Sequence, residues 1–170
     1  MRPTTLCFPV RSDGKVLLGR KKRGFGVRKW NGFGVRKWNG FGGKIEGGET
    51  FLQCAVRELR EETGLMADEG DFELVGFLDF HFSAAPELDH IGYVYILRHW
   101  QGAVCESEEM EPRWFAPHDF PYDEMWKGDR TWVPMVLKED CVKGIITFAP
   151  DGETVQDMEL QPFYPQRLED

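Results

Sequence analysis

The chain has 170 residues, of which 41% are hydrophobic and 14% aromatic, so it is long enough to bury the core of one domain. Its formal net charge of −8 argues against a nucleic-acid polymer as partner, because little besides the basic run at 20–23 would offset phosphate repulsion. A small anionic ligand stays compatible with this charge if metal ions accompany it. No apolar run is long enough to span a membrane and the N-terminus lacks a signal-peptide pattern, so we expect a cytoplasmic protein without a membrane partner.

Hydrophobic periodicity predicts the elements in chain order. The runs TLCFPV and KVLLGR, joined by RSDG, predict a hairpin near the N-terminus. Residues 49–65 carry a helical apolar stripe that ends at Gly64, which predicts the clearest helix of the chain. No linker is visible, so we expect residues 1–170 to form a single domain. Further strands are expected at 72–82, 91–98, 113–115, 144–148 and 156–160, and a second helix at about 129–138.

Four cysteines lie far apart, without a CxxC or Cys/His pair. We therefore expect buried, reduced thiols rather than disulfides or a metal site. The residues are Cys7, Cys54, Cys105 and Cys141.

Three glutamates stand out on the helix predicted at 49–65. Glu58, Glu61 and Glu62 are spaced i, i+3 and i+4, so their carboxylates project from one face and repel one another. Hard divalent cations take oxygen ligands, and Mg²⁺ combines a few carboxylates with waters and substrate phosphates. On these residues alone, a solvated acidic face with Arg57 and Arg60 as i+4 partners is the simpler interpretation.

The surrounding stretch, GGKIEGGETFLQCAVRELREETGL, resembles the signature of the Nudix hydrolase family, which it matches without a gap over residues 43–65. The resemblance implies an α/β fold of mixed α+β character, the Nudix α/β/α sandwich around a mixed β-sheet. It also implies that Mg²⁺, with Mn²⁺ as an alternative, is bound by Glu58, Glu61 and Glu62, and that the backbone at Gly43 approaches the metal. Glu49 would hold Arg57 and thereby orient the helix.

The resemblance extends from about residue 4 to residue 160. KKRGFG, KWNGFGGKIEGGET, ESEEMEPRWF and DEMWKGDRTWVP are similar to MutT-type enzymes, which hydrolyse oxidised purine nucleoside triphosphates such as 8-oxo-dGTP to the monophosphate and pyrophosphate. This similarity implies that Asn39 hydrogen-bonds the purine and Trp126 stacks on it, whereas Glu109 is a further metal ligand or a general base. The remaining pocket positions implied by the resemblance are Thr5, Lys21, Phe33, Phe80, Asp129 and Trp132.

One pocket position departs from the family pattern, which has two consecutive aspartates where this chain has Gly128-Asp129. The loss of a carboxylate removes one hydrogen-bonding group at the base edge. The sequence therefore leaves the preferred purine undecided, whereas the expected phosphate chemistry is unaffected. The aromatic residues also have a simpler interpretation, since Phe and Trp mostly fill cores.

The segment GFGVRKWN occurs twice in tandem, at 24–31 and 32–39. Asn39 belongs to the retained family frame because it adjoins the residues that begin the Nudix signature, and Asn31 is the extra copy. The added residues are either a tolerated insertion in a surface loop or a lid over the pocket. The identical copies also allow a register exchange between Asn31 and Asn39.

Two other functions remain open. A Nudix hydrolase could act on another diphosphate-linked substrate, such as a dinucleotide or nucleotide sugar. A non-catalytic nucleotide-binding module is the second, although all the expected metal ligands are intact. The expected partner is in each case a small nucleotide, and the sequence is compatible with either a monomer or a dimer.

Overall fold

The computed structural model describes residues 1–22 and 36–164. Its larger sheet has five strands in the order β1 (Arg2–Pro9), β5 (His90–Leu97), β4 (Phe72–Phe82), β7 (Val142–Phe148) and β8 (Val155–Pro162). The β1–β5 and β4–β7 pairs are parallel and the other two are antiparallel, so the sheet is mixed. A three-stranded antiparallel sheet follows the order β3 (Trp38–Asn39), β2 (Val16–Lys21) and β6 (Met110–Phe115).

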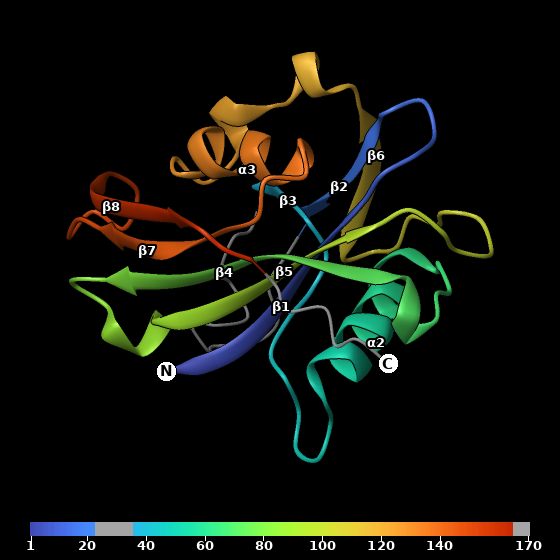
Figure 1. Ribbon diagram of the computed structural model, residues 1–170, viewed down its shortest axis with the longest axis horizontal. Coiled ribbons are helices and arrows are strands. Elements are labelled where there is room, and N and C mark those ends of the chain that lie inside the picture. The colour runs from blue at the N-terminus through green and yellow to red at the C-terminus, as the bar shows by residue number, and fades with distance from the viewer. Residues whose placement is uncertain (23–35, 165–170) are drawn as a thin grey trace.

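Two helices cover opposite faces of the larger sheet (Figure 1). Helix α2 (Phe51–Thr63) buries Ala55 and Leu59 in one apolar cluster, and α3 (Asp129–Leu137) buries Trp132 and Val133 in the other. Successive residues of β1 enter different clusters, because side chains of a strand alternate between faces. The expected α/β/α sandwich around a mixed sheet is therefore confirmed. Short 3-10 helices connect the elements at Glu69–Asp71, Pro86–Leu88, Pro117–Asp119 and Tyr122–Glu124.

Helix α2 has the terminal residues that its sequence predicts. The Thr50 side chain accepts a hydrogen bond from the backbone of Gln53, whose side chain accepts from the backbone of Thr50, which completes a capping box. At the other end Gly64 adopts a φ of 79° and donates its N–H to the carbonyl of Arg60. The predicted helix at 49–65 is thus confirmed, and the second helix and the later strands lie within a few residues of their expected positions.

The expected N-terminal hairpin was wrong. The turn itself forms, with the N–H of Arg11 donating to the carbonyl of Lys15, but beyond it only an isolated bridge joins Val10 and Val16. β1 pairs with β5 in the larger sheet, whereas β2 lies in the smaller one. The physical reason is that the other edge of β1 is already occupied. Cys7 exchanges backbone hydrogen bonds with Phe41, and the N–H of Thr5 donates to the carbonyl of Gly43, so β2 cannot pair there.

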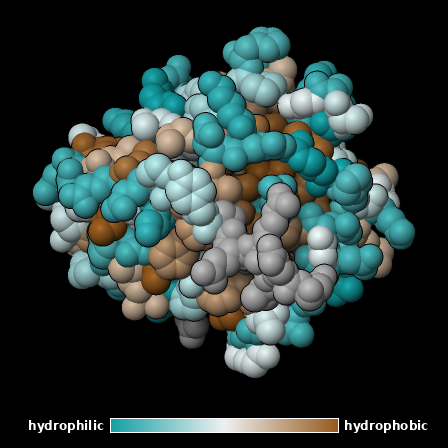
Figure 2. Space-filling model, in the orientation of Figure 1, coloured by the Kyte–Doolittle hydropathy of each residue, from teal (hydrophilic) through white to brown (hydrophobic). Residues whose placement is uncertain are grey.

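All four cysteines are free thiols. Cys7 and Cys54 are buried as expected, Cys141 is partly buried, and the prediction was wrong for Cys105, which is exposed in the loop after β5. Hydrophilic side chains cover most of the face shown in Figure 2, with apolar ones visible between them. Within residues 1–22 and 36–164, no helix combines the length and apolarity needed to cross a membrane.

Candidate active site

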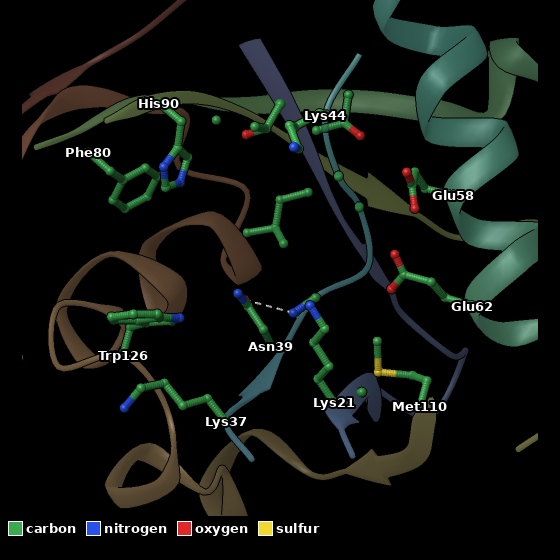
Figure 3. Close-up of a pocket in the computed structure, with 18 of the residues that line it drawn as sticks. Lys21, Lys37, Asn39, Lys44, Glu58, Glu62, Phe80, His90, Met110 and Trp126 are labelled. Atoms are coloured by element: carbon green, nitrogen blue, oxygen red, sulfur yellow. Dashed lines mark hydrogen bonds between the residues drawn. The ribbon is translucent and has the colours of Figure 1, made fainter. Parts of the chain in front are cut away.

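A cavity of about 650 Å³ lies between the acidic face of α2 and the aromatic residues near α3. Figure 3 shows Glu58 and Glu62 projecting from α2 at one end, Phe80, His90 and Trp126 at the other, and Asn39 and Lys21 between them. We call these the acidic end and the aromatic end. The cavity is lined by twelve of the residues expected from the sequence: Thr5, Lys21, Asn39, Gly43, Glu58, Glu61, Glu62, Phe80, Glu109, Trp126, Asp129 and Trp132.

Two expected residues are not among the lining. Arg57 lies behind the acidic wall, where it contacts carboxylates rather than the cavity. Phe33 lies outside the described residues, as does Asn31.

The segment between Asn39 and Gly43 connects the two ends by packing backbone to backbone against β1. Phe41 exchanges two hydrogen bonds with Cys7, at 2.6 and 2.8 Å, and the N–H of Thr5 donates to the carbonyl of Gly43 at 3.0 Å. A β-carbon at Gly42 would overlap the carbonyl of Thr5, so this approach requires a residue without a side chain. A β-carbon at Gly43 would lie 2.6 Å from Glu58 Oε1, which shows how closely the segment passes the acidic wall.

The Arg57 guanidinium organises the acidic end. Its Nε and Nη2 donate to the two carboxylate oxygens of Glu49 at 2.8 and 2.7 Å, a bidentate pair. Its Nη1 donates to Glu58 at 2.9 Å and to Glu61 at 3.2 Å. The hydrogen bonds from Arg57 lower the pKa of Glu49 to about 2. Arg57 therefore ties the loop before α2 to the helix and orients two of the three helix carboxylates.

Glu62 and Lys21 face each other across the acidic end. Burial away from water is the main cause that raises the pKa of Glu62 well above its usual range, and the adjoining carboxyl of Glu58 is the second. Burial lowers the pKa of Lys21, which the nearby carboxylates of Glu62, Glu109 and Glu58 oppose. The acidic end thus concentrates negative charge around one half-buried ammonium group.

The acidic end suits a hard divalent cation. A positive ion beside Glu62 would relieve the burial and repulsion that raise its pKa, and Mg²⁺ needs few protein oxygens when phosphates and water supply the rest. Among the described residues no three His, Cys, Asp or Glu side chains converge into a ready-made metal cage. Glu61 instead points to Arg57, and the carbonyl of Gly43 accepts from Thr5. The donor set therefore fits a cation held jointly by protein and substrate.

The aromatic end presents flat surfaces and one amide. The Trp126 indole packs edge-on against Phe82, with ring centroids 5.8 Å apart, and is tilted against Phe148 at 5.6 Å. Phe80 stacks on His90 at 4.9 Å. Asn39 Oδ1 accepts a hydrogen bond from the N–H of Gly40 at 2.8 Å, which fixes the orientation of the amide. An amide presents both donor and acceptor groups, as the edge of a purine requires.

Two buried polar atoms at this end have no hydrogen-bond partner, Asp129 Oδ2 and Trp132 Nε1. Both residues line the cavity, and both side chains are almost fully buried. Burial raises the pKa of Asp129 to about 7, although the nearby Trp132 indole and the charge of Lys37 act in the opposite direction. Buried polar atoms are normally satisfied, so these two are suited to contact a polar ligand.

Unlike Trp126 and Asp129, Gly128 does not line the cavity. A β-carbon at this position would lie 3.2 Å from the terminal methyl of Met158 and 3.6 Å from Ile146. Apolar groups of β7 and β8 thus lie beside the position at which the family pattern has a carboxylate.

Sequence reasoning did not assign His90 to the aromatic end, and it considered Lys37 only as part of a possible lid over the pocket. His90 is the partner of Phe80 in the β4–β5 register, so correct pairing of the two expected strands would have identified it. Its Nδ1 lies 2.8 Å from the carbonyl of Leu88 and therefore donates to it. Burial lowers the pKa of His90, which favours the neutral imidazole. For Lys37 the signal was its place among the basic residues of the tandem repeat.

The fold and the site together define a class of protein. Residues 1–136 match the family model described as the NUDIX domain. The chain therefore belongs to the Nudix hydrolase family.

Particular relatives extend this similarity. The chain is 39% identical over 152 residues to the oxidized purine nucleoside triphosphate hydrolase of Mus musculus, covering 89% of this chain and 90% of the relative. It is 40% identical over 139 residues to the protein of that name from Danio rerio, covering 82% of each chain. In fold it is similar to the crystal structure of a MutT protein from Bacillus halodurans, with a TM-score of 0.76 and 24% identity, covering 94% of this chain and 97% of the other.

Proposed function

We propose that this protein hydrolyses oxidised purine nucleoside triphosphates such as 8-oxo-dGTP to the monophosphate and pyrophosphate, with Mg²⁺ as cofactor. The observation that carries the proposal is the single cavity that joins a carboxylate cluster to an aromatic, amide-bearing end. The names of the two animal relatives support the substrate class. We further propose that residues 1–170 act as one domain in the cytoplasm, where four free thiols are expected to stay reduced.

At the acidic end, the proposed metal ligands are Glu58, Glu62, Glu61 and Glu109, with the backbone at Gly43. A bound cation would neutralise the phosphates and activate water. Arg57 holds Glu58 and Glu61 in position, and the Lys21 ammonium would contact phosphate oxygens or the base. Glu109 is exposed at the cavity mouth and would act as a ligand or accept the proton of the attacking water.

At the aromatic end, we propose that the base stacks on Trp126 with Phe80 as a further wall. The Asn39 amide would hydrogen-bond the base edge, and Asp129 and Trp132 would supply the two polar atoms that lack partners. Thr5 lies on β1 beneath the segment that links both ends. Because Gly128 stands where the family pattern has the first of two aspartates, this pocket would contact the base edge with one carboxyl instead of two.

The proposal is tested by pyrophosphate release from 8-oxo-dGTP with Mg²⁺ and with a chelator, against a panel of dGTP, other oxidised purines, dinucleotides and nucleotide sugars. We expect Glu58→Gln to lower turnover by roughly a hundredfold or more, since the charge that holds the cation is lost while the shape is kept. Glu69→Gln, an exposed glutamate outside the cavity, is the matched control and should behave as wild type.

The outcomes separate the competing functions. Preferred cleavage of a dinucleotide or nucleotide sugar would replace the proposed substrate while keeping the reaction class. Binding of nucleotides without any hydrolysis would identify a binding module instead. Retained turnover in Glu58→Gln would contradict the proposed role of the acidic end.

A further inference from the structure

Lys37 makes two charge-based contacts at the aromatic end of the cavity. Its Nζ lies 2.9 Å from Glu153 Oε2 and 4.8 Å from the centroid of the Trp126 ring. The Lys37 side chain is only 22% exposed, so water screens it less than a surface lysine. A cation at this distance from an indole face is attracted by the ring quadrupole.

Glu153 is held in place by the turn that connects β7 and β8. Asp151 Oδ1 accepts hydrogen bonds from the N–H groups of Glu153 and Thr154, at 2.9 and 2.8 Å. The preceding Gly152 has a φ of 71°, which this turn requires. The backbone of Glu153 is therefore ordered by its own turn, so placing its side chain beside Lys37 costs less conformational entropy.

The Trp126 indole is bounded on several sides. Phe82 and Phe148 contact it from the larger sheet. In Figure 3 the indole is seen edge-on, with Lys37 on one side of its plane and Phe80 on the other. A stacked purine would thus lie on the Phe80 side, and Lys37 would support the indole from behind.

We propose that Lys37 and Glu153 are positioning residues, and that their ion pair clamps the Trp126 indole in the plane that stacks on the purine base. This inference rests on the proposed function. The pair joins the second copy of the tandem repeat to the β7–β8 turn, with 116 positions of sequence between Lys37 and Glu153. Because it lies at the far end of the cavity from Glu58 and Glu62, its loss affects base binding and spares the phosphate chemistry (Figure 3).

The chain itself offers a matched control. Each copy of the repeat has a lysine directly before its tryptophan, so Lys29 is the counterpart of Lys37. Four single variants form the test: Lys37→Met, Lys37→Arg, Glu153→Gln and Lys29→Met. We expect Lys37→Met to raise the KM for 8-oxo-dGTP roughly threefold to tenfold with kcat little changed. Lys37→Arg should restore the wild-type KM, Glu153→Gln should give a smaller increase, and Lys29→Met should match wild type.

A binding measurement tests the clamp without turnover. Calorimetric titration with 8-oxo-dGMP should show Lys37→Met weakened by the same factor as its KM, at an unchanged thermal midpoint. An unaltered affinity and KM in Lys37→Met would overturn the inference, and so would an equal loss in Lys29→Met. Wild-type binding of 8-oxo-dGMP without hydrolysis of any nucleotide would refute the proposed function alone. Normal hydrolysis by wild type, with KM and affinity unchanged in Lys37→Met, would refute the clamp alone.

Discussion

Asp129 is a carboxyl buried at the aromatic end of the cavity, and its surroundings set its protonation. Removal from water disfavours its charged form and raises its pKa to about 7 from the ordinary 3.8. Between these two values the folded protein holds a proton that the unfolded chain has released. The contribution of Asp129 to the free energy of unfolding is therefore complete below about pH 4 and is lost as the pH rises towards 7.

The Asp129→Asn variant makes this dependence measurable. The amide is neutral throughout, so the unfolding free energy of the variant, relative to wild type, should rise between pH 4 and pH 7 and level off above it. The rise is at most about 4 kcal/mol for a shift of this size. Thermal midpoints of both proteins measured across this range test the expectation, because other titrating groups cancel in the difference. Parallel curves would show that Asp129 keeps an ordinary pKa.

Helix α2 illustrates what local sequence determines at the scale of an element. Its cap residues, Thr50, Gln53 and Gly64, lie within the segment itself, and so do the glutamates that share one face. Such signals need no knowledge of the rest of the chain, which explains why the helix and its acidic face were predicted from sequence. The hairpin prediction was wrong because β1 pairs with β5 along one edge and with residues 41–44 along the other, and both partners lie beyond the local sequence.

Gly64 gives a prediction for this helix. Gly64→Ala should lower the free energy of unfolding by about 1 kcal/mol, because alanine is disfavoured at a φ of 79°. Steric overlap is not the cause, since the nearest atom to a β-carbon there, Cys105 Sγ, is 3.5 Å away. Gly70→Ala is the control, as its β-carbon would meet nothing within 4 Å. Chemical denaturation of both variants checks the difference, and equal stabilities would count against the cap.

At the scale of the whole molecule, the site combines residues that only tertiary structure brings together. The family resemblance identified the acidic residues and most of the aromatic end. It did not identify His90, whose place depends on strand register, or the pairing of Lys37 with Glu153 across the fold. Side chains that meet through distant segments leave no pattern in the local sequence.

The two copies of the tandem repeat are identical, so removing either one yields the same polypeptide. The N–H of Arg36 donates to the carbonyl of Lys21 at 2.7 Å and closes the segment that contains the first copy. Deleting residues 24–31 leaves both closing residues in place. We expect the unfolding free energy to change by less than about 1 kcal/mol, because loop closure depends only weakly on length. Denaturation of the shortened chain tests this, and a large loss would mean that the extra copy is part of the core.

The substrate panel distinguishes the two accounts of the repeat. An unchanged profile in the shortened chain is the outcome expected of a tolerated insertion. A changed preference among purines would instead indicate that the longer segment acts at the cavity as a lid.

The backbone pairing of residues 39–43 with β1 makes this segment a molecular ruler. Hydrogen bonds with Cys7 and Thr5 fix the course of this segment, which runs from Asn39 at the aromatic end to Gly43 beside Glu58. If the base is bound at one end and the reacting phosphorus at the other, the distance from the base determines which phosphate bond is cleaved. Nucleotides with longer polyphosphate tails should then be cut at the same bond as triphosphates, with the surplus leaving as part of the released tail.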